Sequence, residues 1–184
     1  KVIIGTADYR KETMVDLSDI SYAGAKAVVV TLPAEVITRS NAGNIRITGK
    51  DFNLKFNPSV FDTSRVRQYR DRGDAGFRFE LTVADGDVNN QGKTLLSTPY
   101  AMRANFYVGK DMSAVDYLNG YMEFTLEYDR AKADLRRITN IALYRYDEGS
   151  RDWQQLFVRY NSYDMVIRTT INRLGTYAIF GARR

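Results

Sequence analysis

The chain has 184 residues, 44% of them hydrophobic, and its 27 basic and 22 acidic side chains give a net charge of +5. Because cysteine and histidine are both absent, disulfide frameworks, Cys/His zinc sites and catalysis by Cys–His or Ser–His–Asp arrangements are excluded. No apolar run approaches the roughly 20 residues of a membrane span. The first residue is Lys1, so we expect a processed product or an excised fragment.

The first part of the chain predicts short β-strands, because apolar residues recur at every second position. In chain order these strands are expected at residues 1–5, 13–17, 27–32, 45–48 and 52–56. Pro33 is expected to end the third strand, since proline cannot continue a sheet ladder.

The middle of the chain alternates between polar segments and further strands. Residues 64–76 are rich in arginine and predict an exposed loop, with one helical turn as the alternative. Phe77, Phe79, Leu81 and Val83 then fall on one face of a strand. A loop is expected at 85–91, a strand at 104–108 and a turn of helix within 111–118.

The last third of the chain predicts a helix and a strand-rich ending. The Asn119-Gly120 pair predicts a turn before a strand at 121–128, and residues 130–138 have a short helical pattern. Residues 141–180 then form four alternating runs, which predict a four-strand meander. Its turns are expected at Glu148-Gly149, Asn161-Ser162 and Leu174-Gly175.

About twelve strands at these spacings predict an all-β protein, an antiparallel β-sandwich that ends in the four-strand meander and has at most one or two short helices. No linker-like or low-complexity segment interrupts the chain. We therefore expect a single domain over residues 1–184, in which the only seam that could separate two units lies near 64–76.

The ending of the chain resembles β-sandwich modules of secreted and surface-layer proteins of Gram-positive bacteria, including ZU5-like modules. The resemblance lies in the hairpin Leu-Tyr-Arg-Tyr-Asp-Glu at 143–148 with Trp153, and in the last strand Gly-Thr-Tyr-Ala-Ile-Phe at 175–180. The segment at 28–37 is similar to the strand that opens such modules. Together these stretches cover about a third of the chain.

The resemblance implies an extracellular or cell-surface protein without enzymatic activity, a structural or adhesive module near an S-layer. Its expected partners are other surface or cell-wall components, including glycans and anionic polymers. The many aromatic side chains on a β scaffold leave a second reading open, a carbohydrate-binding module or a carbohydrate-active enzyme domain. No catalytic residue and no bound cofactor are predicted.

Trp153 is the candidate for sugar stacking, because aromatic rings provide both core packing and ligand platforms. On the expected hairpin, Ile141, Leu143 and Arg145 fall on one face, whereas Tyr144 and Tyr146 fall on the other. The alternative for Trp153 is a core or rim position at the edge of the sheet.

Asp85, Asp87 and Asn89 form the start of a calcium-binding loop, since alternating oxygen ligands suit a hard cation. The remainder of the pattern fails: Asn90 replaces the glycine of an EF-hand loop, and Leu96 replaces its final glutamate. Calcium is thus a weak prediction, and an ordinary turn is the alternative.

Carboxylates on the predicted strands could form a pair suited to glycoside hydrolysis, which needs about 5–10 Å between the two acids. Glu123 and Glu127 share a face but lie about 13 Å apart on an extended strand. Glu80 could supply the second acid. The alternative is a solvated sheet face with cross-strand ion pairs.

Arg65, Arg67, Arg70 and Arg72 form the densest basic cluster and are the candidate for binding an anionic polymer or an acidic glycan. Tyr69 could stack on a base, but the interspersed Asp71 and Asp74 and the absence of a nucleic-acid-binding motif argue against nucleic acid. A solvated loop is the alternative.

Overall fold

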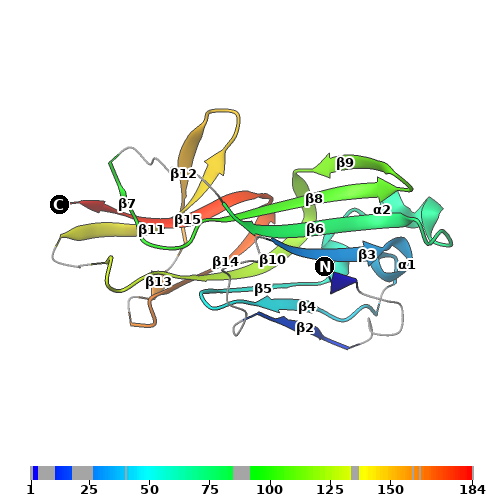
Figure 1. Ribbon diagram of the computed structural model, residues 1–184, viewed down its shortest axis with the longest axis horizontal. Coiled ribbons are helices and arrows are strands. Elements are labelled where there is room, and N and C mark those ends of the chain that lie inside the picture. Colours follow the sequence, from blue (N-terminus) through cyan, green and yellow to red (C-terminus); the bar gives the residue numbers. More distant parts are fainter. Residues whose placement is uncertain are drawn as a thin grey trace.

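The computed structural model describes residues 2–3, 11–17, 27–39, 41–84, 92–133, 137–158, 160–161 and 163–183. Within these ranges the chain forms a nine-stranded and a six-stranded sheet, which face each other in an elongated molecule (Figure 1). The predicted all-β, sandwich-like architecture with short helices is therefore confirmed. In this part of the chain, no helix is both long and apolar enough to cross a membrane.

The larger sheet forms one layer. Its strands are, in spatial order, β1 (Val2–Ile3), β3 (Ala27–Pro33), β6 (Ala75–Val83), β8 (Tyr100–Val108), β15 (Gly175–Arg183), β11 (Ile138–Asp147) and β12 (Asp152–Leu156). Two short strands extend it, with β7 (Thr94–Leu95) pairing β15 and β9 (Asp111–Val115) pairing β8. One half of β8 pairs with β9 and the other half with β15, so this sheet divides into two arms along its length.

The smaller sheet forms the second layer. Its strands are, in spatial order, β13 (Tyr160–Asn161), β14 (Val166–Arg173), β10 (Tyr117–Glu127), β5 (Phe52–Phe56), β4 (Ile45–Thr48) and β2 (Thr13–Asp16). Two pairs are parallel, β1 with β3 and β2 with β4, and both lie at sheet edges. The other described pairings are antiparallel, as the alternating sequence predicts.

The alternation of apolar and polar residues places the core between the layers. Phe77, Phe79 and Leu81 of β6 are buried, whereas Arg78 and Glu80 lie on the other face. Strands β5 and β10 of the opposite sheet alternate in the same way, with Met122, Phe124 and Leu126 of β10 buried. One cluster of buried side chains therefore draws on both sheets. The expectation of a single domain stays a prediction.

Aromatic pairs connect the two layers directly. Phe56 of β5 lies 5.5 Å from Phe79 of β6, measured between ring centroids, and Phe124 of β10 lies 5.8 Å from Tyr177 of β15. Ring pairs in tilted or edge-to-face arrangements stabilise a core by more than the burial of their apolar area alone provides. These interdigitating rings pack the two sheets against each other in the core.

Short helices lie between the strands. They are α1 (Ala34–Ile37), the 3-10 turn η1 (Pro58–Val60), α2 (Thr63–Val66) and the 3-10 turn η2 (Arg67–Tyr69). Asp62 caps α2, since its side chain accepts hydrogen bonds from the backbone N–H groups of Ser64 and Arg65. The Ser64 hydroxyl also donates to this carboxylate and is the main cause of the lowered pKa of Asp62. Residues 64–76, predicted mainly as a loop, thus begin with helical turns.

Three local predictions are wrong. The helical turn expected within 111–118 is strand β9, because this segment hydrogen-bonds to the free half of the β8 edge. The turn expected at Asn119-Gly120 lies inside β10, where the register with β14 shifts between Tyr117 and Met122. The described part of 130–138 forms a turn and the first residue of β11 instead of a helix.

The four C-terminal runs are strands at the predicted places, but they divide between the two layers. β11 pairs with β12 and with β15, whereas β14 pairs with β10 in the smaller sheet. The turn at Glu148-Gly149 is confirmed: the Asp147 carboxylate accepts hydrogen bonds from the N–H groups of Gly149 and Ser150. These two bonds, that from Ser150 first, lower the pKa of Asp147.

Tyr177 is a buried ionisable group in this core. Its hydroxyl donates to the Arg173 carbonyl oxygen at 2.5 Å, and its ring packs against Phe124. Burial raises the pKa of Tyr177 to about 12, although the charges of Arg145 and Arg173 act in the opposite direction. Folding therefore keeps this phenol neutral at a pH where an exposed one ionises.

This difference predicts an alkaline loss of stability. Unfolded Tyr177 loses its proton near its ordinary pKa of 10, before the folded form does. The contribution of Tyr177 to the free energy of unfolding is therefore fully present below pH 10. Above that pH, it decreases by about 1.4 kcal/mol per pH unit until the folded pKa is reached. Urea unfolding of the wild type and of Tyr177→Phe at rising pH measures this contribution as the difference between the two curves. Parallel curves above about pH 10 would contradict it.

Candidate functional site

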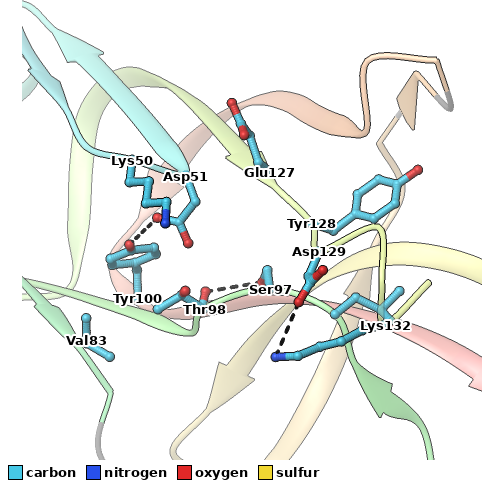
Figure 2. A pocket seen from close by; sticks show the side chains of 11 residues that line it. Lys50, Asp51, Val83, Ser97, Thr98, Tyr100, Glu127, Tyr128, Asp129 and Lys132 are labelled. Atoms are coloured by element: carbon cyan, nitrogen blue, oxygen red, sulfur yellow. Dashed lines mark hydrogen bonds and ion pairs between the residues drawn. The ribbon is translucent and has the colours of Figure 1, made fainter. Parts of the chain in front are cut away.

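A cleft of about 390 Å³ lies where the C-terminal end of β10 meets the start of β8 and the β4–β5 turn (Figure 2). Both sheets contribute to its walls. The lining residues are Lys50 and Asp51 from the β4–β5 turn, Val83 from β6, Leu96, Ser97, Thr98 and Tyr100 from the β7–β8 region, and Glu127, Tyr128, Asp129 and Lys132 from the end of β10. Its volume lies within the roughly 300–1,000 Å³ typical of small-molecule sites.

Backbone hydrogen bonds fix the walls of this cleft relative to one another. The N–H of Glu127 donates to the carbonyl oxygen of Asp51 at 2.8 Å, and the N–H of Asp129 donates to that of Leu96 at 2.7 Å. The Ser97 hydroxyl accepts the N–H of Ile179 at 2.9 Å, which connects the wall to β15. These bonds hold the walls of the cleft in fixed positions, which preorganises it for binding.

Tyr100 and Asp51 form a hydrogen-bonded pair in the wall of the cleft. The Tyr100 side chain is only 3% exposed, and its ring lies 4.7 Å from that of Phe52 between centroids. Its hydroxyl donates a hydrogen bond to the Asp51 carboxylate, and Figure 2 shows the two side chains pointing toward each other. This contact connects β8 of the larger sheet to the β4–β5 turn of the smaller sheet.

The charged groups of the cleft differ in how they are engaged. Asp129 accepts the N–H of Ala131 at 2.9 Å and lies 4.0 Å from the Lys132 ammonium. Lys50 and Glu127 make no side-chain hydrogen bond or ion pair within the described ranges. In Figure 2 the Glu127 carboxylate points away from Asp129 and Lys132. The cleft therefore contains both occupied and free charged groups.

The arrangement favours binding of a polar molecule through hydrogen bonds. Carboxylates accept, ammonium groups donate, and hydroxyls do both. In the described ranges, no group of three or more acidic side chains could hold a metal ion. The three carboxylates of the cleft instead alternate with lysines and hydroxyls along its walls.

Trp153 lies outside this cleft and is 9% exposed. It packs against Phe180 at 4.9 Å and Tyr146 at 5.4 Å, in a small cluster on the outer side of β11 and β15. Leu143 belongs to the main core and Tyr144 to this outer cluster, as the alternation predicts. Trp153 therefore packs at the sheet surface, which was the alternative to its role as a sugar-stacking platform.

The arginine cluster lies on α2, η2 and the following turn, and none of its four arginines lines the cleft. Arg65 lies over the Phe106 ring at 4.5 Å and donates to Ser113, whereas Arg72 pairs with Asp74 through two hydrogen bonds. Arg67 and Arg70 are exposed, and neither has a side-chain partner among the residues described. Two of the four arginines thus have structural contacts, which leaves two for an anionic ligand.

The weak calcium candidates Asp85, Asp87 and Asn89 lie outside the described residues. The calcium prediction stays a prediction.

The carboxylates considered as a hydrolytic pair are not brought together in one site. Glu123 pairs with Lys55 across β10 and β5 at 3.6 Å, and Glu80 pairs with Arg78 on the other sheet at 3.5 Å. Only Glu127 lines the cleft. The alternative of a sheet face with cross-strand ion pairs therefore describes Glu123.

Sequence reasoning missed most of the cleft residues, including Asp51, Tyr100 and Asp129. Nothing in their spacing marks them, because three distant segments supply them. In comparisons with known proteins, no protein-family model matches this chain, and no curated protein is significantly similar to it.

Proposed function

We propose that this chain is a non-enzymatic adhesive or structural module of a bacterial cell-surface or secreted protein. The observation that carries the proposal is a pair of exposed aromatic side chains beside the smaller sheet, Tyr121 on β10 and Phe157 directly after β12. Phe157 is 98% exposed, beside a groove of about 510 Å³ that polar residues of β10 and β14 line. Tyr121 is exposed on the outward face of β10, and we call this surface the β10–β14 face.

Exposed aromatic rings beside polar groups are typical of contact surfaces, because water leaves an apolar side chain readily when a partner covers it. The polar groups of the β10–β14 face are Glu123, Thr125, Arg168 and Thr170. Their mixed charges suit a wall polymer that presents both hydroxyl and charged groups. The segments that resemble surface modules, β11, β12 and β15, are hydrogen-bonded neighbours in one sheet, which also supports the proposal.

The absence of enzymatic activity is part of this proposal. Two of the three carboxylates in the cleft already have hydrogen-bond partners, Asp51 with Tyr100 and Asp129 with the N–H of Ala131. Glycoside hydrolysis needs one carboxyl group as acid and another as base or nucleophile at the scissile bond. Glu127 is the one carboxylate of the cleft without a side-chain partner among the described residues, so the three acids are not held as a matched pair.

Sedimentation of the purified chain with isolated Gram-positive cell walls tests the proposal. We expect the wild type to be retained and Phe157→Ala to be retained several-fold less, because the substitution removes the exposed ring. Reducing-end release from the same walls measures hydrolysis, and we expect none. The proposal fails if the protein stays in the supernatant or if reducing ends accumulate.

A carbohydrate-binding module is the second candidate, and the cleft at the end of β10 favours it. That reading does not conflict with adhesion, since a module can hold a wall through one surface and bind a defined saccharide at another.

A further inference from the structure

We infer that the cleft lined by Asp51, Tyr100, Glu127 and Asp129 binds a neutral saccharide. The inference rests on the proposed adhesive function and names a ligand class and a site for it. It differs from that function in location, because the cleft lies at the C-terminal end of β10 and Phe157 lines a different groove.

The charges of the cleft argue against other ligand classes. Three carboxylates face two lysines, so a polyanion would meet net repulsion. No three acidic groups in the described ranges are placed to hold a metal ion. An apolar ligand would desolvate Asp51 and Asp129 without replacing their hydrogen bonds to water, which is costly. A neutral molecule with many hydroxyls meets none of these penalties.

Saccharide hydroxyls match the polar groups that are present. Each hydroxyl can donate to a carboxylate while it accepts from an ammonium group or another hydroxyl. Glu127 and Lys50 offer one group of each kind without a partner in the described residues, and the second oxygen of Asp51 remains beside the one that Tyr100 contacts. Hydrogen bonds to charged groups are about twice as strong as neutral ones.

The cleft also supplies an apolar surface, which sugar rings require on their C–H faces. Val83 is half-buried and is the more accessible of these apolar side chains, whereas Leu96 and the ring of Tyr100, which packs on Phe52, form the buried base of the cleft wall. Aromatic and aliphatic surface next to fixed hydrogen-bonding groups is the composition expected of a preformed small-molecule site. The backbone bonds across the cleft reduce the entropy lost on binding.

Titration of the ¹⁵N-labelled full chain with cellotetraose, maltotetraose, mannotetraose and N-acetylchitotetraose, each up to about 10 mM, tests the inference by NMR. Heparin is titrated as the anionic comparison. We expect at least one neutral saccharide to shift the amides of Ser97, Thr98 and Asp129, and heparin to leave them unchanged. No shift with any neutral saccharide, or shifts confined to the β10–β14 face, would overturn the inference.

Two substitutions then assign the binding to the cleft. Asp51→Asn keeps an oxygen that accepts the Tyr100 hydrogen bond but removes the charge, and Glu127→Gln changes an exposed side chain without described partners. We expect each to weaken the saccharide by about tenfold. Glu123→Gln is the matched control, because it makes the same change on the same strand outside the cleft, and its affinity should equal that of the wild type. Equal affinities of all three variants and the wild type would refute the site.

The outcomes separate this inference from the proposed function. If the cleft binds no saccharide while cell walls still retain the protein through Phe157, the inference fails and the adhesive function stands. If the saccharide binds in the cleft but walls do not retain the protein, the adhesive function fails and a carbohydrate-binding module is the better description.

Discussion

Replacing Phe56 with alanine is expected to lower the free energy of unfolding by about 3–5 kcal/mol. Phe56 is 2% exposed, and its ring lies 5.5 Å from Phe79 and 6.0 Å from Phe61 between centroids. The substitution removes a ring that joins the two sheets and leaves a cavity that neighbouring strands cannot close. Urea unfolding followed by near-ultraviolet circular dichroism measures the loss.

Phe157→Ala is the matched control for this prediction. The same atoms are removed, but the Phe157 side chain is almost fully exposed, so stability should change by no more than about 0.5 kcal/mol. If the two variants lost similar stability, the layers would not be held together by the shared aromatic core. The control also shows that the Phe157→Ala protein used in the cell-wall experiment is folded.

Gly76→Ala is expected to cost about 3 kcal/mol, because the two strands at this point are too close for a side chain. A Cβ atom at Gly76 would lie 2.1 Å from the carbonyl oxygen of Leu32 and 3.0 Å from the Cα of Pro33, both in the backbone of β3. A rotamer change cannot relieve a clash with backbone. The β3–β6 pairing, in which Gly76 lies opposite Pro33, would have to open at this end.

The control for this prediction is Gly73→Ala, three residues earlier. A Cβ atom at Gly73 would meet nothing within 4 Å, so the unfolding free energy should stay within about 0.5 kcal/mol of the wild type. Thermal unfolding of both variants provides the comparison. A larger loss for Gly73→Ala than for Gly76→Ala would mean that the β3–β6 contact is not as close as described.

The two proposed binding surfaces differ in shape and in the arrangement of their polar groups. The β10–β14 face is open and carries the exposed Phe157, which suits a broad contact with a polymer. The cleft is smaller, and hydrogen bonds fix its walls, so its polar groups point in fixed directions. Arg67 and Arg70 are exposed and have no described side-chain partner, and if they bind an anionic polymer, we expect that binding to weaken at high salt.

The alternation of apolar and polar residues predicted strands well where one face of the strand is buried and the other faces water. β6 is an example: Phe77 and Phe79 are buried and Arg78 is not, as period-2 alternation requires. The pattern failed at Asp111–Val115, where Met112 is exposed and the alternation is weak. That segment becomes a strand because the unpaired half of β8 offers hydrogen bonds, a tertiary effect that overrides local preference.

The sequence by itself therefore determined that the chain is a β-rich sandwich without cysteine or histidine chemistry, and which face of β5 and β6 is buried. The alternation of apolar and polar residues determines which side chains avoid water, and therefore which face of a strand is buried. Only the tertiary structure decided that β14 pairs with β10 in the smaller sheet rather than with β12 or β15, and that Asp51, Tyr100 and Asp129 meet in one cleft. Strand partners and clefts depend on contacts between segments far apart in the chain, which no local spacing encodes.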